Sequence, residues 1–314
     1  MSYFLLQSGE TLAAYSLPVT SGAIATAGTA TDLKATRKVE VENGSFTISG
    51  TDAGLKLGYK VATDFGAISI SGATAGLLAT RSLAIESGSI AITGTAIVLT
   101  YSPLGVYTLS IDAGSLVTLG TDATLSATRK IFNDAGSLTT AGIDAELKFG
   151  RKLSTDIGSI TIAGTAVDFT LTRKIPVSTG AVTISGTDID LTYVPIGSYV
   201  LAIGSGSLAL AGSEIGILAT RILPVESGAI SWAGTAVDVS AARRMTGTSG
   251  TITFTGTSIT LTKASVATYT LAAGSGHISI NGSKVALGPY LPRIIMLSNG
   301  HLAMKLTDTF YLEL

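Results

Sequence analysis

Hydrophobic residues recur along most of the chain in pairs whose members are two positions apart. The segment 39–60, VEVENGSFTISGTDAGLKLGYK, contains three such pairs: Val39 and Val41, Phe46 and Ile48, and Leu55 and Leu57. A spacing of two is the period of a β-strand, because successive side chains point to opposite faces. The Gly, Asn, Asp, Ser and Thr residues between the pairs form turns. The segment therefore predicts three short strands joined by three corners.

The same pattern repeats along the chain in units of 22 residues, with a few units of 26. The twelve units begin at Leu17, Val39, Val61, Leu83, Leu109, Ile131, Leu153, Ile175, Leu201, Leu223, Met245 and Leu271. The extra residues of the longer units fall between position nineteen of one unit and position one of the next, as in LTYSPLGVYTLSI at 99–111. Insertions are tolerated where a chain already turns at the surface. The repeat array is therefore predicted to cover residues 17–288.

Glycine occupies the sixth and twelfth positions of all twelve units. In the first four units these glycines are Gly22, Gly28, Gly44, Gly50, Gly66, Gly72, Gly88 and Gly94. A glycine that recurs at one structural position indicates either a positive φ or a close approach of two backbone segments. We interpret both columns as structural corners of the repeat.

An all-β fold is predicted, with a β-solenoid of three short strands per coil as the favoured architecture. In a solenoid each unit forms one coil, and equivalent residues stack about 4.8 Å apart. However, Asn43-Gly44 between two strands is also a hairpin signal, and blocks of 92 residues close after each of the first two 26-residue units. Tandem antiparallel β-sandwich or barrel domains of that size, and an intertwined trimeric sheet, are therefore alternatives. The solenoid is favoured because the third block, 201–270, lacks a unit, and a stack tolerates that loss more easily than a closed domain.

The two ends of the chain depart from the repeat. Residues 1–16 are predicted to be a partial repeat or an attachment segment. In residues 289–314, Asn299-Gly300 predicts a hairpin turn, and TFYLEL at 309–314 predicts a further strand. This C-terminal segment is interpreted as a β cap over the last coil, and an attachment or trimerisation element is the alternative.

The composition constrains partners and location. Charged residues make up 13% of the chain and hydrophobic residues 46%, which predicts an outer surface partly covered by other subunits. The partner that we expect is the chain itself, in a homo-oligomer that is a trimer or higher. The net charge of −1 and the lack of a basic arm argue against nucleic acid. There is no cysteine, the N-terminus does not resemble a signal peptide, and no apolar stretch is long enough for membrane insertion.

Two positions of the repeat carry most of the recurring charge. Acidic residues recur at position four: Glu42, Asp64, Glu86, Asp112, Asp134, Asp156 and Glu226. We interpret them as solvated turn carboxylates, since the repeat lacks the Gly-Gly-x-Gly-x-Asp pattern of calcium-binding rolls. Arginine recurs at position twenty-one: Arg37, Arg81, Arg129, Arg151, Arg173, Arg221 and Arg243. A solvated edge with packed aliphatic stems is one interpretation, and an interface with acidic groups of another subunit is the other.

The sequence contains no candidate for a catalytic site. His277 and His301 are the two histidines, and both are expected to be exposed. Trp232 takes a core position of its unit and is expected to fill the interior. No phosphate loop, dinucleotide fingerprint, zinc motif or nucleophile elbow is present. We therefore predict no catalytic residue, no metal ligand and no cofactor, and a protein that is not an enzyme.

The repeat text, in segments such as GSFTISGTDAGLKLGYK and GSLVTLGTDATLSATRK, resembles repeat arrays in structural proteins of tailed bacteriophages. The resemblance covers nearly all of residues 17–288, and the ending LSNGHLAMKLTDTFYLEL is similar to the C-termini of phage minor structural proteins. It implies a virion component, of the tail fibre, spike or decoration type, that contacts other virion proteins. A cell-surface adhesin is the alternative, in which the loops around Pro103 and Pro195 bind a glycan. A glycan depolymerase is less favoured, because aromatic residues make up only 6% of the chain.

Overall fold

The computed structural model shows an all-β chain with no helix among the described residues. These are residues 3–6, 12–57, 60–79, 82–101, 109–127, 130–150, 152–171, 174–193, 200–219, 222–241, 244–247, 249–263, 270–273, 277–287, 294–297, 304–305 and 311–312. Accordingly, no described helix is long and apolar enough to cross a membrane.

The chain divides into two compact units. Unit 1 comprises residues 1–154 and 158–165, and unit 2 comprises residues 155–157 and 166–314. The strands of unit 1 are β1 (Tyr3–Leu6), β2 (Leu12–Val19), β3 (Ala23–Val41), β4 (Ser45–Leu57), β5 (Lys60–Thr63), β6 (Ala67–Ala79), β7 (Ser82–Ile85), β8 (Ser89–Tyr101), β9 (Leu109–Ile111), β10 (Ser115–Ala127), β11 (Lys130–Asn133), β12 (Ser137–Ala141), β13 (Asp144–Phe149) and β15 (Ser159–Ala163); the unit boundary falls within β14 (Lys152–Thr155). The strands of unit 2 are β16 (Ala166–Leu171), β17 (Lys174–Val177), β18 (Ala181–Ser185), β19 (Asp188–Tyr193), β20 (Val200–Ile203), β21 (Ser207–Ala211), β22 (Glu214–Ala219), β23 (Ile222–Val225), β24 (Ala229–Ala233), β25 (Ala236–Ala241), β26 (Arg244–Gly247), β27 (Thr251–Lys263), β28 (Thr270–Ala273), β29 (His277–Leu287), β30 (Ile294–Leu297), β31 (Met304–Lys305) and β32 (Tyr311–Leu312).

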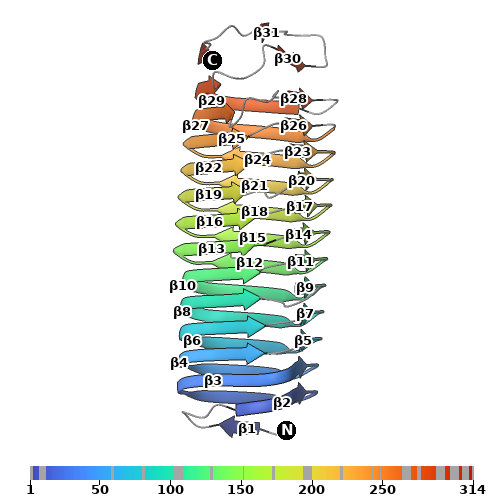
Figure 1. Ribbon diagram of the computed structural model, residues 1–314, viewed down its shortest axis with the longest axis vertical. Coiled ribbons are helices and arrows are strands. Elements are labelled where there is room, and N and C mark those ends of the chain that lie inside the picture. Colours follow the sequence, from blue (N-terminus) through green and yellow to red (C-terminus); the bar gives the residue numbers. More distant parts are fainter. Residues whose placement is uncertain are drawn as a thin grey trace. The chain divides into compact units, whose positions relative to one another are not determined.

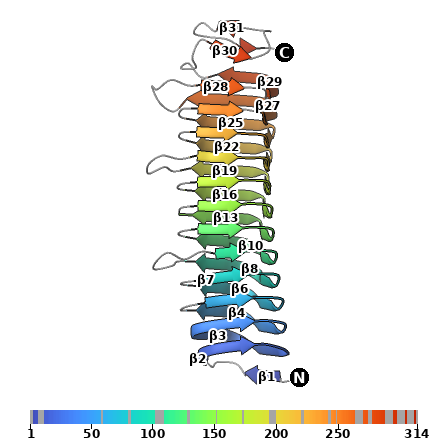
Figure 2. The same cartoon turned by 90° about the vertical axis from the view of Figure 1, so that its right-hand side faces the viewer.

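Parallel pairing between successive repeats confirms the β-solenoid. Ser45 stands opposite Ala23 on one side and Ala67 on the other, so each strand pairs with its equivalent about 22 residues away. Figures 1 and 2 show this stacking within each unit, for example in β4, β6, β8 and β10. The antiparallel hairpin predicted as an alternative for Asn43-Gly44 is not formed, because these residues lie in the bend between β3 and β4. Tandem antiparallel domains are therefore excluded as the architecture of the described repeats.

Each coil has three faces. The first face is formed by short strands such as β5, the second by positions seven to eleven, as in residues 45–49, and the third by positions fourteen to nineteen, as in residues 52–57. In β4, β6, β8 and β10 the second and third faces belong to one 13-residue strand, whereas β12 and β13 are separate. Phe46, Ile48, Ala53 and Leu55 all point inward, and the odd spacing between Ile48 and Ala53 shows that the strand turns a corner there.

The interior is filled by the predicted apolar columns and by one column that the pair pattern missed. Phe46, Ile48, Leu55 and Val61 are fully buried, as the pairs require. Position fifteen is buried as well, by small or branched residues such as Ala53 and Ile97. The third face therefore contributes a longer inward row than the predicted pair at positions seventeen and nineteen. Each large apolar side chain buried in this way stabilises the fold by about 1.5–3 kcal/mol before entropy is counted.

The glycine columns are explained by the close approach of successive coils. A Cβ on Gly44 would lie 2.5 Å from the carbonyl oxygen of Gly22 and 2.6 Å from Cγ1 of Val19. At the twelfth position, a Cβ on Gly120 would lie 2.6 Å from the carbonyl oxygen of Gly94. Gly22, with φ of 104°, is the one described glycine with a positive φ. Glycine is therefore required at these positions mainly because successive coils leave no room for a Cβ, and less because of the backbone conformation.

The pairing register also shows where the extra residues of the longer units lie and how the strands at the two chain ends pair. Leu83 pairs with Leu109, whereas Leu77 pairs with Leu99, so the four extra residues fall between the third face and the next first face, as predicted. At the N-terminal end, β1 and β2 pair in parallel with β3. At the other end, β31 is antiparallel to β30 and β32 to β29. The predicted turn at Asn299-Gly300 lies outside the described residues.

Candidate functional site

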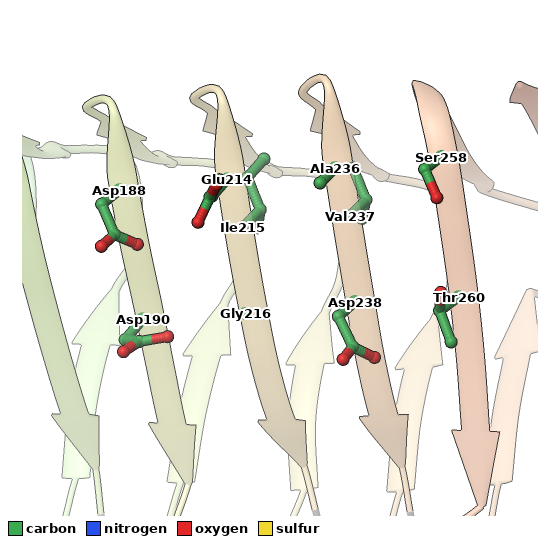
Figure 3. Close-up of a pocket in the computed structure, with 10 residues that line it drawn as sticks. All are labelled: Asp188, Asp190, Glu214, Ile215, Gly216, Ala236, Val237, Asp238, Ser258 and Thr260. Atoms are coloured by element: carbon green, nitrogen blue, oxygen red, sulfur yellow. The ribbon is translucent and has the colours of Figure 1, made fainter.

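The third face of unit 2 carries a surface hollow of about 330 Å³. Four of its lining residues are acidic and come from three neighbouring strands: Asp188 and Asp190 on β19, Glu214 on β22, and Asp238 on β25. Figure 3 shows these carboxylates projecting from the outer side of adjacent strands. The three strands pair in parallel register, which brings acidic residues far apart in the sequence to one place. The hollow is therefore a product of the stacking of coils.

A glycine creates the space within the hollow. Gly216 stands between Asp190 and Asp238 in the registers of the two ladders. A Cβ on Gly216 would lie 2.5 Å from Oδ1 of Asp190, so the carboxylate of Asp190 occupies the space that a side chain would fill. Ala236 and Ser258 keep the neighbouring outward positions small.

The electrostatic environment of the hollow disfavours ionisation. Partial burial raises the pKa of Asp190, and the negative charges of Asp188 and Asp168 raise it further. The residues that line the hollow include no Lys or Arg, although Lys284 pairs in register with Ser258 at its edge. Among the described residues, no group of three or more His, Cys, Asp or Glu side chains is arranged to hold a metal ion. The hollow is thus an anionic recess without coordination geometry.

Unit 1 contains the same local arrangement with a cation added. Asp32 pairs in register with Gly54, and its carboxylate lies above that glycine. Here Nζ of Lys56 donates a hydrogen bond to Oδ2 of Asp32 at 2.8 Å. Lys148 and Glu146 form a second ion pair on the same face. The third face of unit 1 thus carries two ion pairs, whereas no described residue forms an ion pair with the carboxylates of the recess in unit 2.

The acidic column at position four lies in the bends between the first and second faces. The backbone N–H groups of Asp64, Glu86 and Asp112 donate to the carbonyl oxygens of Val41, Thr63 and Ile85, which places one carboxylate per coil. The pKa of Glu86 is raised, first by the negative charge of Asp64 and by a side-chain hydrogen bond with it. Desolvation and the charge of Asp112 raise this pKa further, and the charge of Lys60 lowers it. Glu86 is fully exposed, which agrees with the interpretation of solvated turn carboxylates.

Several residues singled out in the sequence lie where the structure gives no side chain. Arg37 is in β3 with only its backbone described, and the remaining column members lie outside the described residues: Arg81, Arg129, Arg151, Arg173, Arg221 and Arg243. The same holds for the loops around Pro103 and Pro195, and for His301; of His277 only the backbone is described. The arginine interface and the glycan-binding loops therefore remain predictions.

Trp232 is confirmed as a core residue. It is fully buried, and its ring stacks on Phe254 with the ring centroids 4.5 Å apart. Its Nε1 has no hydrogen-bond partner, an arrangement that costs free energy in an apolar interior. The side chain therefore stabilises the core by filling space and by stacking on Phe254, whereas its unpaired indole N–H is destabilising.

The sequence contains a signal for the anionic recess at positions other than the acidic column at position four. Acidic residues recur at positions fourteen and sixteen in consecutive units, as Asp188, Asp190, Glu214 and Asp238. Their proximity depends on parallel register, which local periodicity left open.

No family model, curated protein or solved structure matches the chain.

Proposed function

We propose that the chain is a structural protein of a tailed-phage virion, in which stacked coils form a stiff β-rich element of a fibre, spike or decoration. The observation that carries this proposal is the in-register stacking of coils around an apolar interior. Within unit 1, β4, β6, β8 and β10 pair along almost their whole length, and their inward residues are buried. Bending such a stack would break backbone hydrogen bonds and core contacts in several coils together, which gives stiffness.

The resemblance of the repeat text to phage structural proteins supplies the virion context of the proposal. In that context the protein acts in the virion after assembly in the host cytoplasm, as a homo-oligomer in contact with other virion proteins. No covalent chemistry is assigned to it. Its role is mechanical, and the outward columns are free to provide contacts because the inward columns and glycines hold the coil.

The arginine column is the proposed surface for assembly into a trimer or higher oligomer. Replacing Arg129, Arg151 and Arg173 with Glu would place like charges against acidic groups of a neighbouring copy. The expected result is loss of higher assembly, measured by light scattering and sedimentation. An unchanged assembly state in a folded variant would exclude this surface.

Mass spectrometry of purified particles tests the virion role. The expected result is that peptides of this chain copurify with gradient-purified virions at a fixed ratio to the major capsid protein. A matched fraction from the same lysate, taken away from the particle band, serves as the control. Abundance in the lysate without enrichment in particles would contradict the proposal.

A further inference from the structure

The second face of the coils differs from the other two because it is free of charge. The eleven segments that cover this face and the corner after it, positions seven to thirteen of the first eleven units, run from AIATAGT at 23–29 to TITFTGT at 251–257. None contains Asp, Glu, Lys, Arg or His, although charged residues make up 13% of the chain. The outward residues are almost all Ser, Thr and Ala. Charge is thus confined to the other faces and to the corners.

The second face is also regular. Ser45 to Ser49 pair residue by residue with Ala67 to Ser71, and these with Ser89 to Thr93. The ladders of unit 2 between β18, β21, β24 and β27 have the same unbroken register. Outward side chains therefore form straight rows with a spacing of about 4.8 Å between coils. Small side chains in such rows leave an even surface.

Large apolar side chains gather at one edge of this face in unit 1. Val117 and Leu119 point outward from β10, and Leu119 is 43% exposed. Leu119 pairs in register with Ala141 on β12, and Ile143, in the bend that follows β12, is 56% exposed. Exposed large apolar side chains beside a face without charges are typical of an interaction surface.

We propose that the second face is the surface through which two copies of this chain pack against each other. An identical face is the partner that fits, because side-chain rows can interdigitate along their length only with rows of the same spacing. Parallel, in-register sheets with small side chains form dry contacts of this kind. A pair related by a two-fold axis uses the same patch on both copies, and a face without charges has no like charges to repel.

The area of the face is sufficient for a stable pair. Five residues of strand and one coil spacing give about 80 Å² per coil. The seven coils of unit 1 alone give about 560 Å² per copy, or about 1,100 Å² in the pair. A biological interface needs roughly 1,000 Å² in total, so the face of unit 1 is large enough by itself. Pairing adds a contact to the proposed structural role, and it rests on that role only because both need more than one copy of the chain. Mass spectrometry of purified particles tests the structural role, whereas the mass of the chain in solution tests pairing.

Sedimentation velocity and light scattering of the purified full chain over a wide range of concentration test the pairing. The wild-type chain is expected to have twice its mass of 31.7 kDa, or a multiple of that. The double variant L119K/A141K places four lysines in the contact and should weaken pairing about a hundredfold. The control T100K/S126K puts lysines on the third face, in the column where Lys34, Lys56 and Lys148 already stand, and should change pairing less than about twofold. A wild-type chain that is monomeric throughout, or equal pairing in both variants, would overturn the proposal.

Cysteine substitution keeps the proposal testable if the lysine variant fails to fold. The chain has no cysteine, so S69C, A91C and T139C each introduce a single small thiol on the second face. Treated with a short flexible bismaleimide, at least one should give cross-linked pairs at several times the yield of T100C on the third face. Equal yields from the two faces would count against face-to-face packing.

Discussion

Asp32 in unit 1 and Asp190 in unit 2 occupy the same position of the repeat but have different electrostatic surroundings. Each pairs in register with a glycine of the next strand, and each carboxylate lies above that glycine. In unit 1, Lys56 stands two residues after the glycine and binds Asp32. In unit 2 the corresponding residue is Leu218, and Asp190 lines the anionic recess with a raised pKa. The backbone is the same, so the difference in charge comes from the neighbouring side chains: Lys56 beside Asp32, and Asp188 and Asp168 beside Asp190.

The interiors of the two units differ in a similar way at position ten. In unit 1, Oγ1 of Thr118 donates a hydrogen bond to Oγ1 of Thr140 at 3.0 Å, and both are buried. In unit 2 the same inward column holds Trp232 stacked on Phe254. The coil therefore accepts a polar pair or an aromatic pair at one position, because its path is held by the backbone ladders and glycine contacts.

The largest effect is expected from truncating the aromatic pair. Trp232→Ala should lower the free energy of unfolding by about 3–5 kcal/mol, because it leaves a cavity in a fully buried site. The matched change in unit 1, T118V/T140V, removes both partners of the threonine hydrogen bond at nearly constant shape and should be close to neutral. Urea denaturation followed by circular dichroism measures both. A threonine variant that loses as much stability as the tryptophan variant would show that the two interiors do not differ as described.

The second effect separates glycines that contact backbone from those that contact a side chain. A Cβ on Gly212 would lie 2.5 Å from the carbonyl oxygen of Gly186, which cannot move without disturbing the ladder. Gly212→Ala should therefore cost about 1–3 kcal/mol, as overpacking of a core does. Gly216→Ala is the control, because its Cβ comes close only to the carboxylate of Asp190, the end of a side chain that can rotate away, and it should cost less than about 1 kcal/mol. Equal losses in thermal or urea unfolding would contradict this distinction.

Much of the coil could be predicted from the sequence, because it depends on short-range periodicity. The pairs Phe46 and Ile48 are inward as predicted, and glycine recurs where coils approach each other. Position fifteen was missed because the segment 39–60 has only Ala53 there, although other units carry branched residues such as Ile97 and Ile215 at this buried position. The recess around Asp190 could not be located without the register, since it joins residues from three coils. Periodicity identifies a strand and its inward side, whereas a surface site depends on which strands become neighbours.

The third effect concerns the pH dependence of stability in the recess. The pKa of Asp190 is raised in the folded chain, so its contribution to stability is fully present below its ordinary value of 3.8 and is lost as the pH rises through the folded value. Asp190→Asn removes a charge that burial, Asp188 and Asp168 disfavour. At neutral pH it should stabilise the chain by roughly a few tenths of a kcal/mol, since Asp190 is largely solvated. The gain should disappear below about pH 4. Urea midpoints at neutral and acidic pH measure it, and an equal gain at both would contradict the assignment.

The smallest and most specific effect comes from exchanging the residue that distinguishes the two sites. Leu218→Lys gives unit 2 the arrangement of unit 1, and should lower the pKa of Asp190 and stabilise the chain by about 0.2–0.5 kcal/mol at low salt. Lys56→Leu makes the reverse change and should cost about as little, since both partners of the ion pair are nearly half exposed. Carboxyl-detected NMR titration of Asp190 gives the direct readout, and added salt should reduce both stability effects. If the pKa of Asp190 stayed the same in the folded L218K chain, then the nearby cation would not be what separates the two aspartates, and the difference would have to lie in the neighbouring carboxylates Asp188 and Asp168.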